Sequence, residues 1–179
     1  IPPSLALEAP PENLVTTQTR IHVKGRVDDP KARLLIAGKA CAPGPDGAFE
    51  MDLEFGEGAQ FLVILATDEA GNSGHATRTI LVDRTPPELR WSGTTPGEGM
   101  HIKAGTFTLE VHASKKVTAT LNGKSVEAEA SWRPEDKAWP YLIKTTLPTT
   151  AGALKVELKA TDQVGRQVTL TREWVVDPQ

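Results

Sequence analysis

The chain has 179 residues and a formal net charge of −3, with 39% hydrophobic and 24% charged residues, which is the composition of a folded protein with packed cores. It contains no basic stripe of the kind that binds nucleic acid, and no apolar run reaches the 18 or so residues that span a bilayer. We therefore expect neither a nucleic-acid partner nor membrane insertion of this segment.

The first half of the chain consists of short apolar runs with a period of two. Ile21, Val23 and Val27 alternate with polar residues, and the same alternation returns in 32–36 and 49–55. This period is typical of strands buried on one face. Turn-forming residues rich in Gly, Pro, Asn and Asp separate the runs, so we predict a β-sandwich with little or no helix.

The second half of the chain repeats the first. At an offset of 94, residues 66–83 align with 160–177 with 8 identities in 18 positions. Earlier in the repeat the offset falls to about 85, so the second copy holds extra residues. We predict two domains, 1–85 and 86–179, with an inserted hairpin near 128–150. They meet at Thr85-Pro86-Pro87, where proline has no N–H for strand pairing and stiffens the linker.

Two motifs of the first copy carry a family resemblance. Ala66-Thr67-Asp68-Glu69-Ala70-Gly71-Asn72, followed by Val82-Asp83-Arg84-Thr85-Pro86-Pro87, resembles the bacterial immunoglobulin-like domains over residues 5–87. The second copy has Gln163-Val164-Gly165-Arg166 at this turn, as a diverged member would. The resemblance implies an all-β fold of two tandem immunoglobulin-like β-sandwich domains. It also implies an extracytoplasmic setting in bacteria: the periplasm, the cell surface or a secreted protein.

The residues that usually carry catalysis show no catalytic pattern. The four histidines have neither metal-ligand spacing nor a nucleophile motif beside them. His22 and His112 fall on the polar side of alternating strands, which predicts solvated side chains. Cys41 is the single cysteine, which excludes an intramolecular disulfide, and we expect it to be a structural thiol. We predict no enzymatic activity and no cofactor.

Acidic residues at turns offer a weak calcium site. The carboxylates of Asp28, Asp29, Asp68 and Glu69 are oxygen ligands of the type that Ca²⁺ takes. The alternative is that Asp68 and its repeat partner Asp162 accept hydrogen bonds from the N–H groups of the turns that follow them. The pattern favours the turn role, because no cluster such as D-x-D-x-D is present.

All the tryptophans lie in the second copy. Trp132, Trp139 and Tyr141 lie in the inserted stretch and form a possible binding surface for a sugar ring or a protein partner. The alternative is that they pack in the core or the hairpin. Trp174 aligns with Ile80, which predicts a core position. The first copy is expected to fill its core with phenylalanines instead: Phe49, Phe55 and Phe61.

These observations favour a non-catalytic structural or interaction module. Such a module is a spacer, stalk or adhesion-type domain pair of a larger bacterial cell-envelope or secreted protein. The alternative is an accessory carbohydrate-binding module that uses the Trp-rich hairpin of the second domain. The partner is expected to be a protein or a polysaccharide, and the isolated chain is expected to be monomeric. We expect any specialised surface in the second copy, with the first serving as spacer.

Overall fold

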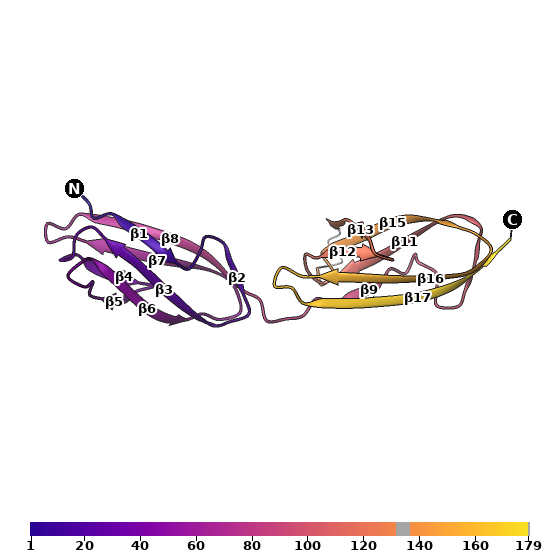
Figure 1. Cartoon of the computed structure of the whole chain (residues 1–179), viewed down its shortest axis with the longest axis horizontal. Helices are drawn as coiled ribbons and strands as arrows, with labels where there is room; N and C mark the ends of the chain where they lie inside the picture. Colours follow the sequence, from indigo (N-terminus) through magenta and orange to yellow (C-terminus); the bar gives the residue numbers. More distant parts are fainter. Residues whose placement is uncertain (132–136, 179) are drawn as a thin grey trace. The chain divides into compact units, whose positions relative to one another are not determined.

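The computed structural model describes residues 1–131 and 137–178, and the regular structure of these residues consists of β-strands (Figure 1). The chain divides into two compact units, Ile1–Arg84 and Thr85–Gln179. Each unit has a hydrophobic core of its own. The predicted all-β class and the two-domain sandwich architecture are confirmed.

The first unit is a sandwich of two sheets. One sheet has the strand order β1-β3-β6, and the other has the order β2-β8-β7-β4-β5. Pairing is antiparallel except between β2 and β8, which run parallel at an edge of the larger sheet. The strands are β1 (Leu5–Ala9), β2 (Leu14–Thr16), β3 (Arg20–Val27), β4 (Arg33–Ile36), β5 (Lys39–Cys41), β6 (Ala48–Glu54), β7 (Gly58–Thr67) and β8 (Ser73–Val82).

The second unit repeats this topology. Its sheets have the orders β14-β15-β11-β9 and β10-β17-β16-β12-β13, and β10 pairs parallel with β17 as β2 does with β8. The extra residues of the second copy supply β14 and lengthen β15, which pair antiparallel. The strands are β9 (Leu89–Trp91), β10 (His101–Lys103), β11 (Gly105–Ala113), β12 (Thr118–Leu121), β13 (Lys124–Val126), β14 (Ala128–Ala130), β15 (Tyr141–Thr149), β16 (Gly152–Thr161) and β17 (Gln167–Asp177).

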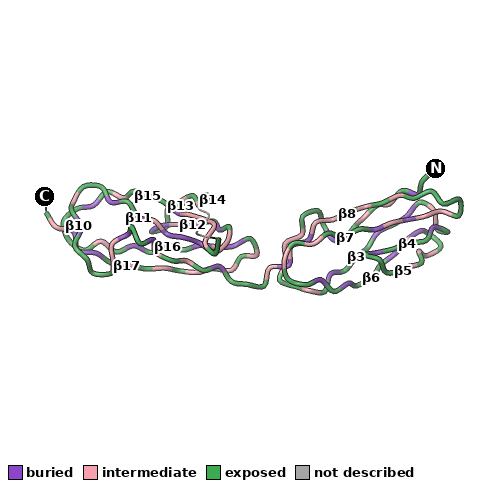
Figure 2. Tube along the Cα trace, turned by 180° about the vertical axis from the view of Figure 1, so that it is seen from behind, coloured by how far each residue is buried: buried purple, intermediate pink, exposed green. Residues whose placement is uncertain are grey.

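The core of each unit lies between its two sheets, and buried residues alternate with exposed ones along the strands (Figure 2). On β3, Ile21 and Val23 are buried as the period of two predicted. Gly25 occupies the next inward position. A Cβ there would lie 2.6 Å from the Ala6 carbonyl oxygen and 2.7 Å from Cζ of Phe49. Glycine at this position therefore lets β1 and the Phe49 ring close over the core.

Two predictions of side-chain burial are wrong. Phe61 was expected in the core, but it is 74% exposed, because its neighbours Leu62 and Ile64 take the inward positions of β7. His112 was expected in solvent, but it is only 7% exposed. Its strand neighbour Arg90 lies opposite it and stacks on Trp139, so this end of the sheet face is covered.

Candidate functional site

The repeated aspartates organise the same turn in both domains. Asp68 Oδ1 accepts a hydrogen bond from the Asn72 N–H, and Oδ2 accepts one from Asn72 Nδ2, both at 2.8 Å. In the second domain Arg166 takes the place of Asn72, donating its N–H to Asp162 Oδ1 at 2.9 Å and its Nε to Oδ2 at 2.8 Å. The turn has thus kept its geometry although its sequence has diverged.

The weak calcium candidates are engaged by the backbone and by positive neighbours. Asp28 Oδ1 accepts the Ser4 N–H at 2.8 Å, and Asp29 Oδ1 accepts the Lys31 N–H at 2.9 Å. The hollow of about 310 Å³ that Asp68 and Glu69 line is also lined by Lys31 and Arg33. Cationic side chains at a hollow oppose a bound cation by like-charge repulsion. Within residues 1–131 and 137–178, no three His, Cys, Asp or Glu side chains are grouped to hold a metal.

Hydrogen bonds to the Asp68 carboxylate explain why its pKa is lowered. The side chain of Asn72, followed by the backbone N–H groups of Asn72 and Ala70, holds the pKa of Asp68 below its usual value. A carboxylate stabilised in this way is an organiser of the turn. This arrangement fits the structural role that the sequence favoured for Asp68.

Trp174 is the centre of the second core, as its alignment with Ile80 predicted. It is fully buried on β17, and its ring makes edge contacts with Trp91 at 5.7 Å and Phe107 at 4.9 Å between centroids. Its Nε1 donates a hydrogen bond to the Pro96 carbonyl oxygen at 3.0 Å. The polar atom of a buried tryptophan is therefore satisfied, which is the normal requirement for this side chain in a core.

The proposed aromatic surface of the insertion is not assembled by the described residues. Tyr141 packs against the core of the second domain. Trp139 is half-buried, and the Arg90 guanidinium lies 4.8 Å from its ring centroid. Trp132 lies outside the described residues. Arg90 also lies opposite the buried His112, whose Nδ1 finds no hydrogen-bond partner among the described residues.

A surface that the sequence did not single out lies on the first domain. Phe61 and Val63 of β7 and Leu35 of β4 are 74%, 47% and 42% exposed, and all three point outward from the larger sheet. Leu65, the partner of Leu35 across the strands, continues the strip. We call this surface the apolar face. Its apolar members are Val15, Leu35, Ala40, Ala59, Phe61, Val63, Leu65 and Leu81.

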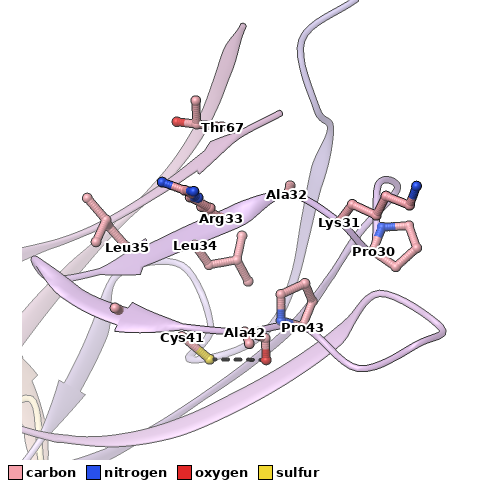
Figure 3. Close-up of a pocket in the computed structure, with 11 residues that line it drawn as sticks. Pro30, Lys31, Ala32, Arg33, Leu34, Leu35, Cys41, Ala42, Pro43 and Thr67 are labelled. Carbon is pink, nitrogen blue, oxygen red and sulfur yellow. Dashed lines mark hydrogen bonds between the residues drawn. The ribbon is translucent and has the colours of Figure 1, made fainter. Parts of the chain in front are cut away.

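A groove adjoins the apolar face at Leu35. It has a volume of about 720 Å³, and its walls come from 30–35, from 40–43 and from Thr67 (Figure 3). Arg33 and Leu35 lie on the same side of β4 as Thr67 in this view, whereas Leu34 lies on the other side. Cys41 lies in the wall, and burial raises the pKa of its thiol, so it is a poor nucleophile. The groove therefore extends an apolar surface and does not present a reactive group.

The fold and its repetition define the class of this protein: it is a tandem pair of immunoglobulin-like domains. Residues 3–84 match the family model described as Glucodextranase, domain B. The solved structure of Rst D1-D2 is similar with a TM-score of 0.56 and 11% identity, over 98% of this chain and 99% of that one. The fibronectin(III)-like modules of Clostridium thermocellum CbhA are similar with a TM-score of 0.51 and 12% identity, over 98% and 95%.

One curated relative matches nearly the whole chain. It is Bacillopeptidase F of Bacillus subtilis (strain 168), which is 30% identical over 182 residues. The match covers 94% of this chain and 12% of the relative, so the chain spans about an eighth of the relative's length. The chain thus has the fold of tandem immunoglobulin-like domains. Along the described residues, no helix has the length and apolar character that crossing a bilayer requires.

Proposed function

We propose that the chain is a non-catalytic interaction and spacing module of a longer extracytoplasmic bacterial protein. The observation that carries this proposal is the apolar face: Phe61, Val63 and Leu35 are exposed together on one sheet of a domain whose core is otherwise complete. Contiguous exposed apolar surface with polar surroundings marks an interaction site in folded proteins. The surface belongs to the first domain, for which the sequence predicted the role of a spacer.

The relatives support a modular role. The matching segment occupies 12% of Bacillopeptidase F, and the family model is named as one domain of a glucodextranase. Both names are those of enzymes that are larger than the matching part. We infer that this chain likewise accompanies other domains and that the parent protein is exported, at the cell surface, in the periplasm or in the medium.

The surroundings of His22 support a non-catalytic role. His22 Nδ1 lies 2.8 Å from Asp52 Oδ1, which is the orienting half of a catalytic triad, but its Nε2 faces Glu50 at 3.8 Å and not a nucleophile. The hydrogen bonds from His22 and then from Arg20 hold the pKa of Asp52 below its usual value, so Asp52 is ionised at neutral pH and is no general acid.

The proposal is tested by measuring the size and the location of the protein that contains this chain in the cell. An antibody against this 19.3 kDa chain is used on separated cytoplasm, envelope and medium of the source organism. We expect a protein much larger than the chain in the envelope or the medium. A free 19.3 kDa species in the cytoplasm would overturn the proposal.

The carbohydrate-binding alternative depends on the aromatic residues of the insertion, and among the described ones a single side chain is left for it. Trp139 is available to it, whereas Tyr141 is packed against the core. A sugar platform usually needs an open aromatic face. The guanidinium of Arg90 occupies one face of the Trp139 ring. The contacts therefore favour the module role.

A further inference from the structure

The second domain carries charged residues on the outward face of the corresponding sheet. At the repeat offset of 94, three consecutive outward residues of β7 correspond to charged residues of β16. Phe61, Val63 and Leu65 correspond to Lys155, Glu157 and Lys159. On β16 these side chains are exposed, and Lys159 Nζ lies 2.8 Å from Glu157 Oε1. The fold therefore does not require apolar residues here.

The neighbouring strand differs in the same way. Leu35 lies opposite Leu65 in the first domain, whereas Thr120 lies opposite Lys159 in the second. Apolar residues on two adjacent strands form a continuous surface, because cross-strand partners are about 5 Å apart on the same face. The apolar face is a difference between two copies of one scaffold, which points to an occupant of the first copy.

The charge pattern of the apolar face suits a second copy of this chain. The outward positions of β7 and β8, all of which are described, carry no Asp, Glu, Lys or Arg. A two-fold contact places each surface against itself, so a face with charges of one sign would repel its copy. This face brings no such repulsion. Arg33 lies at the start of β4, at the border of the face.

The size of the face suits a reversible contact. Strands β7 and β8 have 10 residues each, which makes them about 33 Å long at about 3.3 Å per residue. The other three strands are short, so with a strand spacing of about 4.8 Å the whole outward side of the sheet measures roughly 500 Å² per copy. The apolar face is part of this area, because β8 also places Ser73, His75, Thr77 and Thr79 outward. Two copies then bury at most about 1,000 Å², below the roughly 1,600 Å² of a standard stable interface.

We propose that two copies of this chain associate face to face through the apolar face of the first domain, as a weak and isologous dimer. In this arrangement a two-fold axis passes near the middle of β7, between Val63 and Leu65. Phe61 of each copy then lies toward Leu35 and the adjoining groove of the other copy. An exposed aromatic side chain set against an apolar groove is the usual form of an interface anchor. The sequence suggested a monomer instead, and the experiment below decides between the two.

The inference deepens the proposed interaction role and rests on it. Its test is separate, because self-association is measured on the purified chain, whereas the module role is measured on the natural gene product. A chain that does not associate leaves the parent-protein result untouched.

The experiment is sedimentation velocity on the full chain between about 1 µM and 1 mM. The range extends to high concentration, because the buried area is below that of a standard stable interface. We expect the weight-average mass to rise reversibly with concentration from that of the 19.3 kDa monomer toward twice that value. The test variant carries Phe61→Lys together with Val63→Glu, the residues that the second domain uses at these positions. We expect it to bind itself at least tenfold more weakly.

Two controls separate the surface from the fold. Far-ultraviolet circular dichroism and the urea midpoint of the double variant should match those of the parent chain, because both positions are exposed. The matched variant Val175→Thr removes an apolar side chain that is 41% exposed on the second domain, and it should leave association unchanged.

Two results would overturn the proposal. One is a monomer throughout the concentration range, which would assign the apolar face to a different protein. The other is association that the double variant retains while it stays folded.

Discussion

Trp174 lies at the centre of the second core, and its removal should destabilise that domain alone. Its side chain is 0% exposed and lies between Trp91 and Phe107. Changing a buried tryptophan to alanine removes about 3–5 kcal/mol of stability through lost burial and the cavity left behind. The lost hydrogen bond to the Pro96 carbonyl is worth about 1 kcal/mol of that, because Arg172 Nη1 still donates to the same oxygen at 2.9 Å.

The chain contains its own reporters for the two domains. All four tryptophans belong to the second domain, so tryptophan fluorescence in urea follows that domain and not the first. The single thiol, Cys41, is half-buried in the first domain, so its reaction with a thiol reagent follows the first. With a urea slope of about 1–2 kcal/mol per molar for a domain of this size, Trp174→Ala should lower the fluorescence midpoint by about 1.5–5 M.

We expect the urea midpoint followed by fluorescence to fall, and the urea midpoint followed by the thiol reaction to stay unchanged. Trp174→Phe is the matched milder variant, because it keeps a ring in the core and should move the midpoint by less than the alanine variant. A fluorescence midpoint that stays within about 0.5 M of the parent would refute the core position. Equal shifts of both reporters would refute the separate cores.

Four further predictions follow from the contacts described. Gly25→Ala should lower the stability of the first domain by about 1–3 kcal/mol, because the new methyl meets the Ala6 carbonyl; an unchanged urea midpoint would contradict this. Asn72→Ala should raise the pKa of Asp68 toward its ordinary value, seen in a carboxyl NMR titration. Because the folded pKa is lowered, the turn adds stability above the ordinary Asp pKa and loses it as the pH falls through the folded value, so the variant should lose part of this pH dependence. Calorimetry should show no calcium binding; micromolar binding that Asp68→Ala abolishes would reverse this conclusion. Affinity electrophoresis in polysaccharide gels should retard neither the chain nor Trp139→Ala; retardation that depends on Trp139 would establish the carbohydrate-binding alternative.

The fold could be predicted because it depends on local periodicity and on the repeat. Alternation placed Ile21 and Val23 inward without knowledge of their partners, and burial confirmed them. The alignment of Trp174 with Ile80 identified equivalent core positions, and both residues are fully buried. Such positions are determined by strand geometry, which a sequence shows directly.

The apolar face could not be predicted from alternation, because β7 is apolar on both sides. When neighbouring residues such as Phe61 and Leu62 are both hydrophobic, the pattern does not say which one faces the core. The repeat held the missing signal: the position of Phe61 is Lys155 in the second copy, and an inward position would not hold a lysine. The predicted solvent exposure of His112 was wrong for a different reason. Arg90 lies opposite it and stacks on Trp139, and both residues are distant from His112 in sequence.

The central claim, that the first domain carries the interaction surface, is tested most directly by an amide NMR spectrum of the full chain recorded at high and low concentration. We expect the shifts that change on dilution to lie in β4, β7 and β8, with the largest near Phe61 and Leu35, and the amides of the second domain to stay in place. Changes confined to the second domain would contradict it, whereas a spectrum that does not depend on concentration would overturn the proposed dimer and leave the surface to a different protein.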